Sequence, residues 1–459
     1  MYKIKLTGIK PKNVYVELID IFLRPDEYIC IVDDDQDETD NIEFEYNLEF
    51  NGESYNNHKN LIKQQIYLTL SVLTGKKPEW GILTGIRPVK IAGELIRATK
   101  NRENAKSLLI DFYLLSEKNA EQILKMHEHE NIFIGEADEN SVGIYIGIPF
   151  CPTRCLYCSF TSNLGNEQQI QDYLEALHKE IQFVGTEMLK KGQYPESIYF
   201  GGGTPTTISA NQLDQLLSLV ENTFNLDNCI EITVEAGRPD TITKDKLEVI
   251  AKHKIERICI NPQTMKNSTL KLIGRNHSAE QIVNAFEIAR DAGIKIINAD
   301  LIAGLPKEKC TDFQETLQKV IELGAENITV HTLAVKRASR LKDIDSLFHY
   351  KQENVVCEML DFAEEMLAAN GYRPYYLYRQ KHMAGGLENV GYCKEQTDGI
   401  YNMRIMDEHQ TIIALGAGGI TKVYFPDEDR LERVPNVSNY EIYIERIDEM
   451  IKRKKDNLF

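Results

Sequence analysis

The chain has 459 residues, of which 42% are hydrophobic and 27% are charged, and its formal net charge is −17. This length predicts two or three domains, because a single hydrophobic core rarely grows so large. The acidic balance argues against a sequence-independent grip on nucleic acid, which requires a basic surface. No apolar run reaches the roughly 18 residues of a membrane span. The start lacks the apolar segment of a secretory signal, and an odd number of cysteines suits a reducing compartment, so we expect a cytoplasmic protein.

Residues 1–140 are predicted to form an N-terminal α+β domain. We expect strands at residues 3–9, 14–22 and 27–32, and residues 42–50 resemble a hairpin arm that turns at Asn51-Gly52. Six acidic side chains crowd residues 33–40, but their spacing is not that of a calcium loop. Helices are expected from residue 58 onward and near residues 88–98 and 116–127. The residues of this domain suggest no chemistry.

After residue 140, short β-rich runs alternate with longer amphipathic segments. The predicted strands are residues 143–148, 197–200, 230–235, 257–261, 295–301 and 327–332, and the predicted helices are residues 169–189, 210–224, 244–253, 279–292 and 311–323. Such alternation predicts parallel strands joined by right-handed crossovers. We predict an α/β protein whose residues 141–340 form an open six-fold (β/α) partial TIM barrel, with a doubly wound sheet as the alternative.

Residues 341–459 are predicted to be a C-terminal α+β extension that closes the substrate site. A helix is expected at residues 351–369, ended by Asn370-Gly371. Residues 372–381 are dense in aromatic and basic side chains, residues 412–422 hold three glycines in an apolar run, and a terminal helix is expected at residues 441–455.

Three cysteines, Cys151, Cys155 and Cys158, follow the first predicted barrel strand at C-x3-C-x2-C spacing. Three thiolates on one short loop can hold three corners of a cubane iron–sulfur cluster, which usually has four cysteine ligands. One iron would then keep an open site for a small molecule. A structural zinc site normally needs a fourth nearby ligand, and the next cysteine is Cys229. The spacing favours the cluster and leaves zinc as the alternative.

Glycines and polar side chains follow the ends of the other predicted strands. In parallel β/α barrels the site lies at the carboxyl ends of the strands, and here those ends carry Gly202, Gly203, Thr204, Glu235, Gln263, Asp300, His331 and Ala334. Each alone could be a tight turn or a structural acid. Together on one rim they predict a ligand site, where the glycines would let a ligand approach backbone amides.

The chemistry that fits this rim is the reductive cleavage of S-adenosylmethionine. Its amino and carboxylate groups can chelate the open iron, while Glu235, Gln263, Arg275 and Asp300 could bind the amine, carboxylate and ribose hydroxyls. One electron from the reduced cluster would then yield a 5′-deoxyadenosyl radical. The cofactor performs the difficult step, and the fold supplies its position.

On these residues the chain resembles the radical S-adenosylmethionine superfamily and, within it, the oxygen-independent coproporphyrinogen III dehydrogenases (oxidases) of the HemZ type. The resemblance covers about residues 143–422, and the phrases at residues 83–90 and 376–381 extend it. It implies one [4Fe-4S] cluster on the three cysteines and S-adenosylmethionine, with two molecules in some members. The implied cofactor contacts are Tyr145, Tyr157, Gly202, Gly203, Thr204, Glu235, Gln263, Arg275, Asp300, Ala334 and Ile420.

The chain departs from the family's usual sequence motifs at two places. Gly147 stands where the family commonly has histidine, in the strand that leads to the cysteines. Gly237-Arg238 replaces the Asn-Pro or Asp-Pro that follows the glutamate. These departures concern the second cofactor and the porphyrinogen, whereas the three cysteines match the family.

Family membership implies that coproporphyrinogen III propionates are converted to vinyl groups, giving protoporphyrinogen IX. A reducing partner such as flavodoxin or ferredoxin would supply electrons. Guanidinium groups match carboxylates bidentately, so the candidates for binding this four-carboxylate substrate are Arg154, Arg337, Arg340, Arg373 and Arg379. The alternatives are a haem-binding chaperone of the same fold, with His331, His349 or His382 as ligands, and a radical enzyme acting on haem, on a methylation target or on an RNA base.

Overall fold

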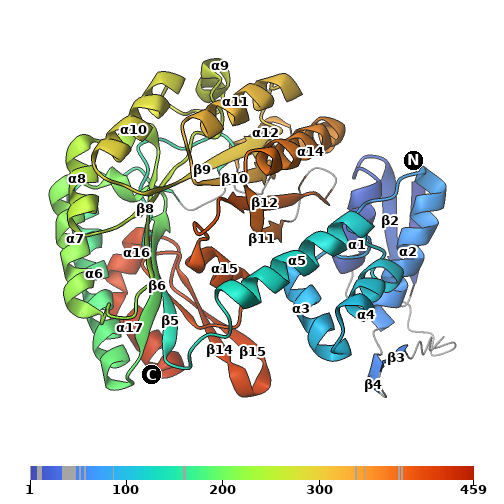
Figure 1. The fold of residues 1–459 in the computed structure, drawn as a ribbon, viewed down its shortest axis with the longest axis horizontal. Helices are drawn as coiled ribbons and strands as arrows, with labels where there is room; N and C mark the ends of the chain where they lie inside the picture. Colours follow the sequence, from blue (N-terminus) through green and yellow to red (C-terminus); the bar gives the residue numbers. More distant parts are fainter. Residues whose placement is uncertain are drawn as a thin grey trace.

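The computed structural model describes residues 2–7, 13–33, 48–50, 53–55, 58–85, 87–158, 162–335, 339–345, 347–380, 383 and 386–459. A large, mostly parallel sheet forms the main body, and helices cover its outer face in an arc (Figure 1). The amino-terminal helices lie to one side of this body. No helix in the described ranges is long and apolar enough to cross a membrane.

Six consecutive strands run parallel to one another, and they lie side by side in chain order. They are β5 (Ser141–Ile148), β6 (Tyr194–Gly202), β7 (Glu231–Gly237), β8 (Arg257–Ile260), β9 (Ile296–Ala303) and β10 (Asn327–Thr332). The helices between them are α6 (Glu167–Lys190), α7 (Ala210–Thr223), α8 (Lys244–Lys252), α9 (Asn267–Leu272), α10 (Ala279–Asp291) and α11 (Cys310–Glu322). The predicted mixed α/β fold is confirmed. The strand order never reverses, which argues against the doubly wound alternative.

The C-terminal segment adds strands to both edges of this sheet. Strands β11 (Arg373–Arg379) and β12 (Glu388–Cys393) continue it beyond β10, while β13 (Ile412–Leu415) pairs in parallel with β5 and leads to β14 (Ile420–Phe425) and β15 (Arg430–Pro435). The remaining helices are α12 (Arg340–Ile344), α13 (Phe348–Lys351), α14 (Glu353–Ala369), α15 (Ile400–Asp407), α16 (Tyr440–Glu445) and α17 (Ile447–Leu458). Residues 141–435 therefore contribute to one 11-stranded sheet.

A buried ion pair joins the last helix to the first barrel helix. Lys454 on α17 and Glu180 on α6 are both fully buried, and Lys454 Nζ lies 2.6 Å from Glu180 Oε1. Glu180 Oε2 also accepts from the Gly416 amide at 2.7 Å and from the Tyr443 hydroxyl at 2.6 Å. Burial opposes the ionisation of Glu180, but Lys454 and these donors outweigh it and lower its pKa. The chain terminus is thereby fixed to the turn after β13.

The amino-terminal part contains β1 (Tyr2–Thr7), α1 (Asn13–Phe22), β2 (Tyr28–Asp33), β3 (Leu48–Phe50), β4 (Glu53–Tyr55), α2 (His58–Thr74), α3 (Pro88–Thr99), α4 (Arg102–Ser107) and α5 (Glu117–Phe133). Strands β3 and β4 pair in antiparallel fashion, as expected of a hairpin, whereas residues 42–47 of the predicted arm and Asn51-Gly52 lie outside the described residues. Residues 34–40, most of the acidic run, lie outside the described residues. Helix α5 leads from this part toward the sheet (Figure 1).

The predicted strand at residues 14–22 is wrong, because this segment forms helix α1. Its buried side chains, Tyr15, Leu18, Ile19 and Phe22, recur at helical rather than alternating spacing. Phe22 packs edge-on against Tyr67 of α2, with ring centroids 5.2 Å apart. The helix also serves as the crossover that the parallel pair β1 and β2 requires. Tertiary packing has outweighed the β propensity of the valines and isoleucines.

Candidate functional site

The cysteine loop begins directly after β5. The Cys151 amide donates to the Asn163 carbonyl at 3.0 Å, and the Cys151 Sγ lies 3.4 Å from the Thr204 hydroxyl. Cys155 is buried, whereas Cys151 and Cys158 are partly accessible, and none of the three forms a disulfide. Burial raises the pKa of the Cys151 thiol, with Thr204 and Arg238 acting in the opposite direction.

Backbone and side-chain contacts hold this loop against neighbouring segments. The Leu156 amide donates to the Ile273 carbonyl at 2.9 Å, and its carbonyl accepts from the Leu341 amide of α12 at 3.1 Å. The Thr153 hydroxyl donates to the Gly274 carbonyl at 3.1 Å. The loop is thus fixed between the segment that follows α9 and the start of α12.

The glycine loop after β6 lies directly on the start of the cysteine loop. The Gly203 and Thr204 amides donate to the carbonyls of Ile148 and Phe150, each at 2.8 Å. A Cβ atom on Gly203 would lie 2.5 Å from the Phe150 oxygen, and Gly202 adopts a φ of +110°. We had expected these amides to face a ligand. The structure uses both N–H groups within the chain, and the glycines allow two backbones to approach.

A stack of tyrosines lies beside Glu235 on the face of the sheet opposite the covering helices. The rings of Tyr199 on β6 and Tyr401 on α15 stack with centroids 4.6 Å apart, and Tyr145 on β5 lies 6.3 Å from each. The Tyr199 hydroxyl donates to Glu235 Oε1 at 2.5 Å. Burial raises the pKa of Glu235 to about 7 against this hydrogen bond, and the charge of Asp300 acts in the same direction as burial.

A second polar group lies on β9 and β10. Asp300 Oδ1 accepts a hydrogen bond from the side-chain Nδ2 of Asn298 at 2.8 Å, and Asp300 Oδ2 lies 3.6 Å from His331 Nε2. The other His331 nitrogen lies 3.2 Å from the Tyr378 hydroxyl. Burial opposes the ionisation of Asp300, but His331 and Asn298 outweigh it and lower its pKa. The two neighbouring acids therefore have pKa values shifted in opposite directions, a pattern typical of functional sites.

Several buried polar atoms near this group have no hydrogen-bond partner among the described residues. They include Gln263 Oε1, Asn261 Oδ1 and Arg275 Nε. Gln263 has a positive φ of 66°, which is rare for a residue with a side chain, and its amide donates to the Asp300 carbonyl at 2.9 Å. Arg275 Nη1 donates to the Asn261 carbonyl at 2.5 Å. Buried polar atoms are usually satisfied, so these unpaired atoms point to a missing polar ligand.

The other predicted contacts occupy different surroundings. Tyr157 packs in a small apolar cluster with side chains such as Ile273 and Leu305. Ala334 follows β10 and forms an isolated bridge with Met383. Ile420 begins β14 at the turn beside the end of β5, and 51% of it is exposed. Direct contacts thus join Tyr145 to Glu235 through Tyr199, and join Gln263 to Asp300.

Comparison with known proteins gives concordant results. The model of the radical SAM superfamily matches residues 145–320. The oxygen-independent coproporphyrinogen-III oxidase-like protein HemZ of Bacillus subtilis is 39% identical over 410 residues, which cover 88% of this chain and 81% of that protein. The haem chaperone HemW of Lactococcus lactis is 33% identical over 50% of this chain and 60% of its own length.

The chain belongs to the radical SAM superfamily, in the family of HemZ-like oxygen-independent coproporphyrinogen-III oxidase-like proteins. Among solved structures, coproporphyrinogen III oxidase (HemN) of Escherichia coli superimposes with a TM-score of 0.55 and 22% identity, covering 69% of this chain and 71% of that one. This likeness supports the predicted partial barrel at the level of the fold.

The radical SAM family implies a [4Fe-4S] cluster and S-adenosylmethionine. Three thiols with the family's spacing would provide the donors that a cluster needs. The unpaired atoms of Gln263 and Arg275 would provide polar partners for the cofactor. Within the described ranges, no three His, Cys, Asp or Glu side chains form a metal-binding group. The donor chemistry fits the cluster better than a four-ligand zinc site.

The arginines proposed for substrate binding lie in different places. Arg154 is exposed within the cysteine loop, and Arg340 is exposed at the first residue of α12. Arg373 pairs with Asp398 at 2.7 Å near the start of β10, at the opposite end of the sheet. Arg379 is buried, donates to the Leu83 and Gly386 carbonyls and lies over the Trp80 ring. Arg337 and His382 lie outside the described residues, as does the side chain of His349.

Arg379 instead joins the two flanking family phrases. It belongs to residues 376–381, and the Leu83 carbonyl that it contacts begins residues 83–90. Trp80 beside it donates to Glu388 at 2.7 Å. These contacts fix the amino-terminal part to the edge strands β11 and β12, which is a structural role rather than the substrate role that we expected.

Two residues of the site could not be found from the rim pattern. Tyr199 lies within β6, two residues before the glycine loop, and its sequence position signals only a strand. Tyr401 comes from α15, whose Ile400 and Tyr401 amides donate to the buried Glu231 carboxylate at 2.9 and 3.3 Å. That helix reaches the sheet face through long-range contacts, so no local sequence pattern predicts it.

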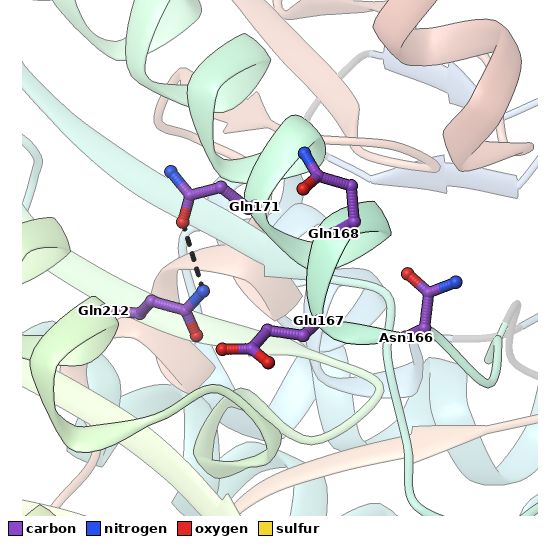
Figure 2. A pocket seen from close by; sticks show the side chains of 5 residues that line it. All are labelled: Asn166, Glu167, Gln168, Gln171 and Gln212. Atoms are coloured by element: carbon purple, nitrogen blue, oxygen red, sulfur yellow. Dashed lines mark hydrogen bonds between the residues drawn. The ribbon is translucent and has the colours of Figure 1, made fainter.

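A pocket of about 510 Å³ lies outside this constellation. It is lined by Asn166, Glu167, Gln168 and Gln171 at the start of α6 and by Gln212 on α7 (Figure 2). The Gln212 amide donates to Gln171 Oε1 at 3.2 Å. The pocket is not lined by the three cysteines, by Glu235 or Asp300, or by the tyrosines of the candidate site, so we do not assign it to the reaction.

Proposed function

We propose that this radical SAM enzyme decarboxylates two propionate side chains of coproporphyrinogen III to vinyl groups, giving protoporphyrinogen IX. The observation that carries the proposal is the 39% identity to the HemZ of Bacillus subtilis across 88% of this chain. Each propionate would lose a hydrogen atom, carbon dioxide and one further electron. The electron would pass to an acceptor, and a reducing partner such as flavodoxin or ferredoxin would supply the cluster.

The residues of the site have distinct roles in this proposal. Cys151, Cys155 and Cys158 would hold the cluster, which together with S-adenosylmethionine supplies a radical that abstracts hydrogen. Glu235 would bind the cofactor amine, and the ionised Asp300 would accept from the ribose hydroxyls. Gln263 and Arg275 have unpaired buried atoms that suit the remaining polar groups. The stack of Tyr145, Tyr199 and Tyr401 beside Glu235 would limit the access of water to the site from the side of α15.

Substrate carboxylates would be bound at the rim. Arg154 and Arg340 are both exposed, and the Leu341 amide that follows Arg340 donates to Leu156 of the cysteine loop. A guanidinium can bind a carboxylate through two parallel hydrogen bonds. These two arginines therefore lie close to the loop that would hold the cluster.

Product mass tests the proposal. The reconstituted protein is incubated anaerobically with S-adenosylmethionine, a reductant and coproporphyrinogen III. We expect porphyrinogens lighter by one and by two units of carbon dioxide plus hydrogen. Deoxyadenosine without such products would contradict the decarboxylation and leave another radical reaction. Stoichiometric haem capture and transfer without turnover would favour the chaperone function, which the similarity to haem chaperones makes the second candidate.

Cofactor binding should depend on pH through Glu235. Its pKa is raised by burial to about 7, so below that pH the Glu235 carboxyl carries a proton that must leave before the carboxylate can accept a hydrogen bond from the iron-bound amine. Through Glu235, the affinity for S-adenosylmethionine should therefore fall toward acid, approaching tenfold per pH unit below 7. Calorimetric titration between pH 6 and 7.5 measures this slope.

Two variants isolate the carboxylate responsible for this slope. Glu235→Gln should bind more weakly and show a shallower dependence on pH. Glu308→Gln, which removes another buried acid whose pKa is raised by burial, should keep it. An unchanged slope in Glu235→Gln would refute the assignment of the amine to this carboxylate.

A further inference from the structure

Arg238 is a buried arginine at the end of β7, beside the cysteine loop. Only 3% of it is exposed. The preceding Gly237 has a φ of +62°, which residues with side chains rarely adopt, and the Arg238 amide then donates to the Ala236 carbonyl at 2.8 Å. The family's usual proline would remove this amide and would provide no cation. Arg238 therefore places a positive charge at a position where the family's usual sequence has an uncharged proline.

One edge of the Arg238 guanidinium is fixed by an acid. Its Nε and Nη2 donate to the two oxygens of Asp240, at 3.0 and 2.9 Å. Such a bidentate pair sets the plane of the guanidinium as well as its position. The third nitrogen, Nη1, is therefore directed away from Asp240 by a rigid group.

The free edge of the guanidinium meets the cysteine loop. Nη1 donates to the Thr153 hydroxyl at 2.7 Å and to the Thr153 carbonyl at 3.1 Å, and it lies 3.9 Å from the Cys155 sulfur. Thr153 in turn donates to the Gly274 carbonyl, which links the loop to the segment after α9. One side chain thus contacts the loop between its first two cysteines and also one of the sulfur atoms.

We propose that Arg238 is a positioning residue for the iron–sulfur cluster, fixing the cysteine loop and raising the reduction potential through its charge beside Cys155. Hydrogen bonds to cluster sulfurs and nearby net charge are the protein's means of setting such potentials. Reduction adds one negative charge to the cluster. The Arg238 guanidinium stays protonated, so its positive charge stabilises the reduced state. Asp240 offsets part of this charge. The inference rests on the radical SAM part of the proposed function and not on its substrate.

The test is the midpoint potential of the reconstituted protein, followed by electron paramagnetic resonance during a redox titration without porphyrinogen. In Arg238→Gln, we expect the equilibrium constant for reduction to fall about tenfold, which is about 59 mV for one electron. In Asp240→Asn, the potential should rise, because the acid no longer offsets the guanidinium. Arg238→Lys should keep most of the potential, because the charge remains.

Opposite shifts in the two variants distinguish charge from mere loop support. If Arg238→Gln and Asp240→Asn shift the potential in the same direction, or if neither shifts it, the proposal is overturned. Should Arg238→Gln take up no cluster, Asp240→Asn decides, because a potential that does not rise in that variant overturns the proposal. Arg290→Gln is the matched control, since it breaks an arginine–glutamate pair (Glu326, 2.8 Å) at the other end of the sheet, and its potential should be unchanged. If the potentials shift as predicted but the protein does not convert coproporphyrinogen III, the proposed substrate is refuted and the role of Arg238 stands.

Discussion

The Cys155→Ser variant is expected to lose all formation of 5′-deoxyadenosine. A serine hydroxyl is not ionised at neutral pH and does not replace a thiolate as an iron ligand, so the loop would retain two of its three donors. Without a stable cluster no electron reaches S-adenosylmethionine. Iron and sulfide content, the paramagnetic signal of the reduced protein and the chromatographic yield of deoxyadenosine measure the loss.

Cys310→Ser provides the matched control for this variant. Cys310 lies at the first residue of α11, on the outer layer, and its sulfur accepts from Gln314 at 3.6 Å. Its replacement should leave both iron content and deoxyadenosine yield near those of the parent protein. Cleavage at the parental rate in Cys155→Ser would contradict a cluster on the C-x3-C-x2-C loop.

Replacing Lys454 by methionine should produce the second large effect, a loss of stability. The change leaves the Glu180 carboxylate buried without its counter-ion, and breaking such a pair typically costs about 3 to 5 kcal/mol. Urea unfolding measures the cost. Lys455→Met, at an exposed neighbouring position, should change the free energy of unfolding by less than about 0.5 kcal/mol.

The pH dependence and a double variant test the same network. The folded-state pKa of Glu180 is lowered, so its contribution is present above its ordinary value and is lost as the pH falls through the folded value. In Lys454→Met the penalty should shrink in acid, where Glu180 becomes protonated. Adding Glu180→Gln should restore part of the stability at neutral pH. A double variant as unstable as the sum of the single variants would contradict the coupling.

The parallel strands could be predicted because they are local signals. The predicted and observed ends of β5 to β10 differ by at most three residues, since each strand is a short apolar run bounded by turn residues and followed by a helical period. Helix α1 could not be predicted in the same way. Its Val14 and Ile19 favour a strand locally, and only the packing of Phe22 on Tyr67 shows which periodicity applies.

The site was predictable as far as the strand ends reached. Glu235, Gln263 and Asp300 could be proposed because they follow strands that the sequence itself reveals. Tyr401 was missed because it arrives from a helix more than 150 residues away, and Arg379 was misjudged because a basic, aromatic segment does not say where its guanidinium points. The departure at Gly147 has a local reason, since a Cβ there would lie 3.3 Å from the Tyr145 ring and 3.4 Å from the Leu415 carbonyl.

The pairing of β13 with β5 has a consequence for the order of events during synthesis. The first barrel strand gains its second neighbour only when residue 412 has been made, and the ion pair that supports the adjoining turn awaits residue 454. Until residues 412–415 have been synthesised, β5 therefore presents an unpaired edge beside the cysteine loop. A chain truncated before residue 412 would keep its cysteines while leaving the edge of β5 exposed to association with other chains.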